Sequence, residues 1–481
     1  MQFALVARTL GILLILFSAS LVPPLVFSWL VNDGEAVNFS VTMLTGLCLG
    51  VLMCLLFKPT VERVRNRDGF IIVALMWVTM SGLGSLPFMY SLGMSPADAL
   101  FEATSGVTTT GSTVIIGLEH LSDSILIFRQ ELQWLGGIGI VVAAVALLPM
   151  LRIGGMQLYR AETPGPMKED KLTPRITQTA RALCGLYVSM TAVCAVLYWV
   201  AGMSAFDAVA HSMTTLSTGG YSTHDASLAY FDNAAIELIA IVFMTVGGIN
   251  FSIHFLVWQN FDLRRYWENA EVRVFLVLTV ATIGLVAVVL HFADSSYSVL
   301  SALRYAAFEV VSVVTTTGYG IRDFSVWPLA LPVIFIFMSF VGGCGGSTSG
   351  GMKVVRFLIL AKQASIQVQR LIHPQLVRSL KIDERVIADH VVDAIWGFFV
   401  LYVVTFVITM VLLMMDGMDQ VTAFGAVATC MNNLGPGLGD VATDFVGVSD
   451  ASKYLLAFAM IAGRLEIFTI LVLLTPAFWT Q

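Results

Sequence analysis

Long apolar runs separated by short polar segments dominate the chain. Residues 71–90, 274–290 and 454–474 are three such runs. Each reaches or approaches the roughly 20 residues that a helix needs to cross about 30 Å of hydrocarbon. The strict alternation that is typical of barrel strands is absent. The pattern therefore predicts an all-α integral membrane protein.

The N-terminal region resembles a signal peptide, because Arg8 precedes an apolar run that extends to Phe27. That run is long and contains Pro23 and Pro24, and a second apolar run follows at residues 39–57. A secreted domain would not begin in this way. We therefore expect residues 1–68 to form a retained hairpin of two spans.

Four short polar segments recur along the chain with a period near one hundred residues. Their glycines, here called the anchor glycines, are Gly111 in VTTTGST, Gly220 in LSTGGYS, Gly318 in VTTTGYG and Gly435 in MNNLGPG, separated by 109, 98 and 117 residues. An alanine stands twelve positions before each anchor glycine, a hydroxyl residue six before and a small polar residue three before. These three columns are Ala99, Ala208, Ala306 and Ala423; Ser105, Thr214, Ser312 and Thr429; and Thr108, Ser217, Thr315 and Asn432. Such agreement indicates internal repeats.

The spacing within each repeat leaves room for only about ten helical residues before the polar loop, or roughly 15 Å, which is half a bilayer. Each repeat is therefore predicted to contain a span, a half-helix, a loop and a second span. We expect the four repeats at residues 69–178, 179–271, 272–389 and 390–481. With the N-terminal hairpin, the expected fold class is four fused span/half-helix/polar-loop/span repeats in a pseudo-fourfold array.

The distribution of charged residues along the chain predicts its orientation in the membrane. Only 12% of the 481 residues are charged and 57% are hydrophobic, whereas soluble domains carry roughly 25% charged residues. Of the 26 Lys and Arg residues, 21 belong to Arg8 and to residues 58–67, 152–181, 264–273 and 353–385. By the positive-inside rule both termini are cytoplasmic and the four loops open outward.

The four loops together could form a site for a cation. Non-helical backbone at membrane depth must be buried in protein or line a watery cavity, and carbonyls around a common axis can replace the water shell of a cation. In any one repeat, the small residues could instead serve close helix packing. Four loops in register, each after a half-helix, favour the ion site. Nine positions before the anchor glycines stand Glu102, His211, Glu309 and Ala426, which we expect to brace the loops rather than to tune the field in the pore.

Two further features interrupt the apolar spans. Residues 342–353, here called the glycine-rich loop, contain six glycines, and each glycine costs roughly 1 kcal/mol in a helix relative to alanine. The span must break there, either as a mobile flap or as a packing kink. Arg464 lies in the last apolar run, where a charge needs a partner or water. It could repel ions or brace the flap, or it could pair locally with Glu466.

The loop sequences, together with GGCGGSTSGGMK after the third loop and GRLEIFT in the last span, resemble the Trk/Ktr/HKT superfamily of potassium transporters, and within it the bacterial TrkH type (TrkH, TrkG and TrkI). The resemblance implies four units that are each similar to a potassium-channel subunit, K+ as the transported ion and a homodimer. It assigns the potassium filter to Thr109, Thr110, Gly111, Thr218, Gly219, Gly220, Thr316, Thr317, Gly318, Asn433, Leu434 and Gly435. It assigns the gate to Gly342, Gly343, Gly345, Gly346, Gly350, Gly351, Lys353 and Arg464.

The same resemblance implies a bacterial inner-membrane protein, surrounded by membrane lipid, that works with a cytosolic nucleotide-binding subunit of the TrkA type. We expect that subunit to dock at the basic segments 152–181 and 353–385, and no nucleic acid partner. The chain has no phosphate-binding fingerprint, so a nucleotide (ATP/ADP or NAD) would act only through the partner. Transport of Na+ or NH4+ is an alternative, and whether the protein is a symporter or a channel stays open. A membrane enzyme is disfavoured because neither HExxH nor GxSxG occurs.

Overall fold

The protein is almost entirely helical. The computed structural model describes residues 2–58, 66–142, 172–293, 297–328, 330–383 and 385–479. In this part of the chain the one sheet is an antiparallel pair of two-residue strands, β1 (Lys381–Ile382) and β2 (Arg385–Val386). The predicted fold class is therefore confirmed, with a small hairpin added.

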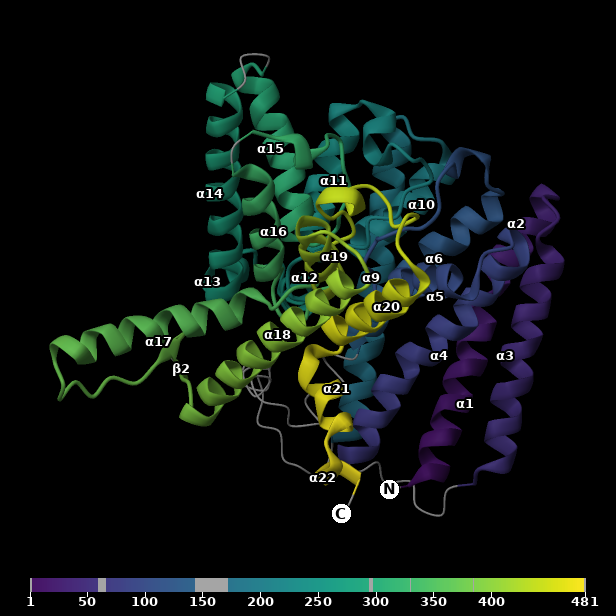
Figure 1. Ribbon diagram of the computed structural model, residues 1–481, viewed down its shortest axis with the longest axis horizontal. Helices are drawn as coiled ribbons and strands as arrows, with labels where there is room; N and C mark the ends of the chain where they lie inside the picture. Colours follow the sequence, from purple (N-terminus) through teal and green to yellow (C-terminus); the bar gives the residue numbers. More distant parts are fainter. Residues whose placement is uncertain are drawn as a thin grey trace.

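The N-terminal hairpin consists of α1 (Phe3–Ser20), α2 (Val22–Val31) and α3 (Ala36–Leu56). Helix α1 ends where Pro23 and Pro24 stand in the first turn of α2, a place that tolerates proline because its amide has no helical partner. Helices α1 and α3 lie side by side (Figure 1). A Cβ at Gly11 would stand 2.7 Å from the carbonyl oxygen of Gly50. Glycine thus allows the close approach that membrane helices use in packing.

Each repeat contains a first span, a half-helix and a second span, in that order. The first spans are α4 (Asn66–Leu92), α9 (Leu172–Val200), α14 (Ala270–Ala293) and α18 (Asp389–Met415). The half-helices are α5 (Pro96–Val107), α10 (Ala205–Leu216), α15 (Val299–Val314) and α19 (Gln420–Asn432). The second spans are α6 (Asp123–Val142), α11 (Ala234–Gly247) with α12 (Phe251–Asn260), α16 (Leu331–Val341) with α17 (Val354–Ile372), and α20 (Asp450–Arg464) with α21 (Glu466–Leu474).

Short helices connect these elements. One turn of 3-10 helix follows each polar loop, and the two remaining helices lie in the connection before α14 and at the C-terminus. They are η1 (Leu118–His120), η4 (Ser227–Phe231), η5 (Phe324–Val326), η6 (Gly439–Val441), α13 (Arg264–Glu268) and α22 (Pro476–Trp479). The return path from each loop is thus built in the same way in all four repeats.

The half-helices begin in the same way because each has a polar N-cap. The side chains of Ser95, Ser204 and Ser298 accept a hydrogen bond from the backbone amide three residues on, and Asp419 accepts from Val421 and Thr422. Such caps satisfy amides that have no partner within the helix. The half-helices contain 12, 12, 16 and 13 residues. All are longer than the ten predicted from spacing, and α15 exceeds that length by more than one turn.

The second spans are more broken than the sequence suggested. The axes of α11 and α12 differ by 100° and those of α20 and α21 by 113°, and α16 has only 11 residues before the glycine-rich loop. By length and composition, six described helices could cross a membrane, or eight if each bent pair counts as one span. The sequence predicted two spans in the N-terminal hairpin and two in each repeat. The two spans that this criterion does not identify correspond to α6, which carries Asp123, Arg129 and Glu131, and to the interrupted α16.

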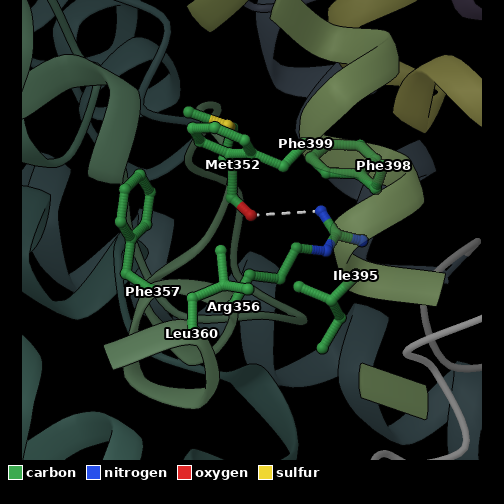
Figure 2. Close-up of a pocket in the computed structure, with 7 residues that line it drawn as sticks. All are labelled: Met352, Arg356, Phe357, Leu360, Ile395, Phe398 and Phe399. Carbon is green, nitrogen blue, oxygen red and sulfur yellow. Dashed lines mark hydrogen bonds between the residues drawn. The ribbon is translucent and has the colours of Figure 1, made fainter. Parts of the chain in front are cut away.

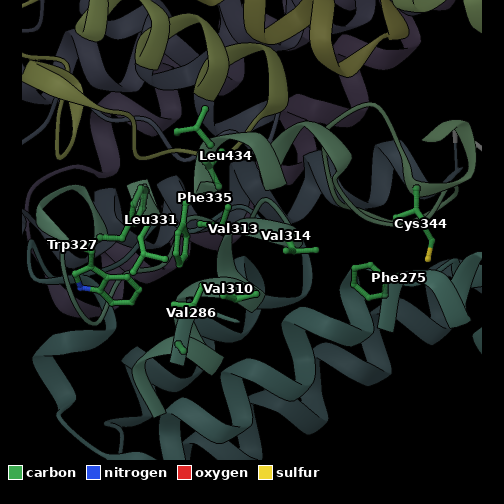
Figure 3. Packing of buried hydrophobic residues seen from close by; sticks show 14 of the residues in the cluster. Phe275, Val286, Val310, Val313, Val314, Trp327, Leu331, Phe335, Cys344 and Leu434 are labelled. Atoms are coloured by element: carbon green, nitrogen blue, oxygen red, sulfur yellow. The ribbon is translucent and has the colours of Figure 1, made fainter. Parts of the chain in front are cut away.

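The third repeat packs around its half-helix. Figure 3 shows Val310, Val313 and Val314 of α15 surrounded by apolar side chains of α14, α16 and the fourth loop. Helix α17 runs away from the bundle, the chain then turns back to β2 beside this helix, and both termini lie at one end of the molecule (Figure 1). The polar loops are thus enclosed by helices, whereas the connection after α17 projects from the bundle.

Candidate functional site

The four polar loops leave their half-helices through the same backbone turn. The residue two before each anchor glycine has a left-handed conformation: φ is 53° at Thr109, 50° at Thr218, 53° at Thr316 and 55° at Asn433. Few residues other than glycine adopt this region. The next amide then donates to the carbonyl five residues back, from Thr110 to Ser105, Gly219 to Thr214, Thr317 to Ser312 and Leu434 to Thr429, at 2.7–3.0 Å. These acceptors are the recurring hydroxyl residues found in the sequence.

The loops interlock in a closed ring. A Cβ placed on Gly111 would collide with the carbonyl oxygen of Gly219, one on Gly220 with that of Thr317, and one on Gly318 with that of Leu434. The ring closes where a Cβ on Gly435 would stand 3.1 Å from the carbonyl oxygen of Thr110. All four anchor glycines have positive φ, between 78° and 104°. Each anchor glycine therefore lies against the carbonyl of the residue that precedes the next anchor glycine.

Side chains on the half-helices brace the backbone that follows the ring. A Glu102 carboxylate oxygen accepts from the amide of Val114 at 2.9 Å. One oxygen of Glu309 accepts from the amides of Ile321 and Arg322 at 2.8 and 2.9 Å. His211 contacts the hydroxyl of Ser222 at 3.0 Å. These three contacts agree with the bracing that we expected. Ala426, at the equivalent position of the fourth repeat, has no polar side chain for this role.

Gln133 is a supporting residue that the sequence did not reveal. Its Nε2 donates to the carbonyl of Gly219 at 2.6 Å, and its Oε1 accepts from the amide of Tyr221 at 3.0 Å. A Cβ at Gly219 would overlap the Gln133 side chain, which explains the second glycine of the second loop. Gln133 lies 86 residues from Gly219, and no periodic pattern marks it.

The fourth loop is joined to the first by a side chain. Asn433 donates through Nδ2 to the hydroxyl of Thr110 at 2.8 Å and to the carbonyl of Met460 at 3.1 Å. Ser112 donates to the carbonyl of Gly435 at 2.9 Å. The asparagine that replaces threonine in this loop thus helps to close the ring between the two ends of the repeat series.

The glycine-rich loop contacts the ring where the half-helices end. Thr218 donates to the hydroxyl of Thr348 at 3.2 Å, and the Gly350 amide donates to the hydroxyl of Thr316 at 2.6 Å. The Gly351 amide donates to the carbonyl of Asn432 at 3.0 Å. The loop is therefore bonded to the second, third and fourth repeats.

Arg464 supplies the contact with the first repeat. Its Nη2 donates to the hydroxyl of Thr109 at 2.6 Å and also to the carbonyl of Thr348. Lys353 donates to the carbonyl of the neighbouring Ser349. Two cationic groups thus hold adjacent carbonyls of the glycine-rich loop beside the ring. The side chain of Glu466, the alternative partner of Arg464, lies outside the described residues.

The glycines predicted for the gate have distinct roles in this loop. Gly342, Gly346 and Gly351 have φ of 66°, 70° and 72°. A Cβ at Gly343 would stand 2.6 Å from the hydroxyl of Ser349, and one at Gly350 would overlap the carbonyl of Asn432. The amide of Gly345 donates to the Glu271 carboxylate at 2.7 Å. The structure thus brings all the predicted loop and gate residues into one region.

The end of the glycine-rich loop is fixed to the fourth repeat. Arg356 in α17 donates to the carbonyl of Met352 at 3.1 Å, and its guanidinium lies 4.1 Å from the centre of the Phe398 ring in α18. Figure 2 shows these groups around a small pocket with mainly apolar walls. The lining residues are Met352, Arg356, Phe357, Leu360, Ile395, Phe398 and Phe399.

Among the described residues, no group of three His, Cys, Asp or Glu side chains could hold a metal ion. Oxygen atoms that could serve a cation at the ring are those of the backbone, of hydroxyl side chains and of the Asn433 amide, whose buried Oδ1 accepts no hydrogen bond from the described residues. Of the basic segments expected to dock a partner, residues 152–171 lie outside the described part, and residues 353–383 form the end of the glycine-rich loop, α17 and the start of the hairpin.

Comparison with known proteins gives consistent matches over the whole chain. The family model described as TrkH, cation transport protein, matches residues 36–480. The chain is 48% identical to the Trk system potassium uptake protein TrkH of Halomonas elongata and 47% identical to that of Vibrio parahaemolyticus, over 100% of both chains in each case. The crystal structure of the potassium transporter TrkH from Vibrio parahaemolyticus superposes with a TM-score of 0.93 at 44% identity, again over 100% of both chains.

Proposed function

Because this chain belongs to the TrkH family of cation transport proteins, we propose that it takes up potassium ions through the ring formed by its four polar loops. The chain is a multi-pass membrane transporter, not an enzyme. The relatives with 48% and 47% identity are named potassium uptake proteins. The single observation that carries the proposal is the closed ring of anchor glycines and neighbouring carbonyls.

The ring has the chemistry of a site for a dehydrated cation. The carbonyls of Thr110, Gly219, Thr317 and Leu434 would act as ligands, because carbonyl oxygens can replace the hydration shell of K+. The filter would include the residues that flank them, namely Thr109, Gly111, Thr218, Gly220, Thr316, Gly318, Asn433 and Gly435. The C-terminal ends of four half-helices point toward this region, and their negative partial charges favour a cation. The Gly219 carbonyl also accepts from Gln133, which leaves it one lone pair for an ion.

The glycine-rich loop would be the gate. It is bonded to the ring residues Thr218 and Thr316, and Arg464 joins it to Thr109. A guanidinium and the Lys353 ammonium beside the pore would repel K+ electrostatically. The conformation described here would thus be closed, and opening would require the loop and Arg464 to separate from the hydroxyls of the ring.

Control of the gate would come from the cytoplasm. Because the relatives are bacterial Trk proteins, we place the protein in the inner membrane of a bacterium. Both termini would be cytoplasmic, because Lys and Arg concentrate near the N-terminus and in the connections between the repeats. The relatives are named as parts of a Trk system. A TrkA-type nucleotide-binding subunit would dock on the basic connections, and the transporter would act as a homodimer.

Uptake of 86Rb+ into proteoliposomes that contain the purified chain tests the proposal. We expect excess K+ to abolish this uptake. Na+ or NH4+ at the same concentration should reduce it only weakly. Equal competition by Na+ or NH4+ would assign the pore to another monovalent cation. Absence of any monovalent flux, with and without a regulatory subunit, would contradict the transport proposal. Empty liposomes provide the control.

A further inference from the structure

One buried carboxylate holds both arms of the glycine-rich loop. Glu271, the second residue of α14, is only 3% exposed. Its Oε1 accepts from the amide of Gly345 within the loop at 2.7 Å and from the amide of Val355 just after the loop at 3.3 Å. Hydrogen bonds to a charged acceptor are roughly twice as strong as neutral ones. Glu271 therefore fixes the two arms of the loop relative to the first span of the third repeat.

Other backbone amides of the loop donate to neutral acceptors in neighbouring segments. The amides of Cys344 and Thr348 donate to the carbonyls of Gly248 and Gly247, at the break between α11 and α12, at 2.8 and 3.2 Å. The amide of Gly350 donates to a threonine hydroxyl. Glu271 binds Gly345 and Val355, which lie on either side of residues 348–351, the part of the loop that contacts the ring. The loop therefore cannot leave the ring as a unit unless the hydrogen bonds to Glu271 break or α14 moves with it.

The same end of α14 is tied to the small hairpin. The carboxylate of Asp383, in the turn between β1 and β2, accepts from the amide of Ala270 at 3.1 Å. Ala270 directly precedes Glu271. The hairpin is joined to α17 because Lys362 donates to the carbonyl of Lys381 at 2.8 Å. Ile382, Val355 and Ala270 belong to one apolar cluster. A displacement of the hairpin would thus reach Glu271 through a single residue.

We propose that Glu271 is the positioning residue that holds the glycine-rich loop closed, and that the β1–β2 hairpin transmits movement of the cytoplasmic connection to it through Asp383. This inference rests on the proposed function of the loop as a gate. Glu271 contacts no ring residue in these hydrogen bonds. Its loss would therefore change how often the pore opens and would leave ion selection unchanged.

Single-channel recording of Glu271→Ala and Glu271→Gln in lipid bilayers tests the proposal. Glu271→Ala removes a charged acceptor of two hydrogen bonds, so we expect its open probability to rise by roughly tenfold or more. Glutamine retains an acceptor oxygen at the same reach, and Glu271→Gln should fall between Glu271→Ala and the unmodified protein. The permeability ratio of K+ to Na+ should be the same in all three. Asp383→Ala should raise the open probability in the same direction, by less.

The matched control is Glu268→Ala, an exposed carboxylate three positions earlier, which should leave the open probability unchanged. An open probability of Glu271→Ala equal to that of the unmodified protein would overturn the proposal, and so would a changed permeability ratio. If Glu271→Ala does not fold, Glu271→Asp, which shortens the side chain, must give the increase. Absence of conductance in the unmodified protein would instead contradict the proposed function.

Discussion

At the residue scale, the anchor glycines are equivalent in sequence but not in the space around them. A Cβ at Gly111, Gly220 or Gly318 would overlap a carbonyl of the next loop, whereas one at Gly435 would be only tight, at 3.1 Å. The left-handed backbone adds roughly 1 kcal/mol of strain for a residue with a side chain. Substitutions at the four positions should therefore differ in severity.

We predict that Gly220→Ala and Gly318→Ala reduce 86Rb+ uptake by roughly tenfold or more, the effect of about 1.4 kcal/mol, while Gly435→Ala retains a measurable fraction. The cause is displacement of a carbonyl that lines the ring. Gly284→Ala is the control, because Gly284 in α14 has open space and no positive φ. Equal loss at all four anchor glycines would show that backbone strain, and not the collision, governs the ring.

Arg464 provides a second prediction at this scale. Arg464→Ala removes the donor that joins Thr109 to the Thr348 carbonyl, so uptake should increase severalfold. Arg464→Lys retains the charge but places it on a side chain of different shape and reach, and should give an intermediate value. Uptake is measured at matched protein density in the liposomes. If uptake by Arg464→Ala decreases although the variant elutes normally in size-exclusion chromatography, the arginine supports conduction.

At the element scale, the half-helices could be predicted from the sequence and much of their surroundings could not. Their C-terminal ends follow from the nearly constant distance to the anchor glycine, whereas α15 begins one helical turn earlier than the repeat pattern indicates. The bends between α11 and α12 and between α20 and α21 were missed, because only short glycine signals mark them. Gln133 and Glu271 were missed because they act on segments 86 and 74 residues away. Long-range partners of this kind leave no periodic pattern in one sequence.

The half-helix of the first repeat is also held by a buried ion pair. Arg129 of α6 lies 2.8 Å from Glu102 of α5, with side chains 1% and 0% exposed. Its Nη1 also donates to the carbonyl of Ser222, in the second repeat. Removal of one partner leaves a buried charge, which costs about 3–5 kcal/mol.

We therefore predict that Glu102→Ala lowers the melting temperature of the detergent-solubilised protein by several degrees. The double variant Glu102→Ala/Arg129→Met should recover part of the loss, since it removes the unpaired charge. Fluorescence-detected thermal unfolding measures both. Additive losses in the double variant would indicate that the two side chains stabilise the protein independently.

At the scale of the whole molecule, ion pairs and charged hydrogen bonds join neighbouring repeats around the ring. Lys453 of α20 lies 2.6 Å from Asp98 of α5 and connects the fourth repeat to the first. The Nε of Arg304, in α15, donates at 2.6 Å to Glu237, in α11, and connects the third repeat to the second. Arg129 connects the first to the second. Three basic residues that lie outside the basic connections thus stabilise the array.

Closure of the array would make the four divergent loops a single ion site, and ion binding at this site can be observed directly. The measurement is the anomalous difference density of Rb+ in crystals of the protein grown in a rubidium salt. We predict a peak on the axis of the ring, within coordination distance of the carbonyl oxygens of Thr110, Gly219, Thr317 and Leu434, that is lost in Gly318→Ala. Rubidium density only outside the ring, or none in a protein that transports Rb+, would contradict the account.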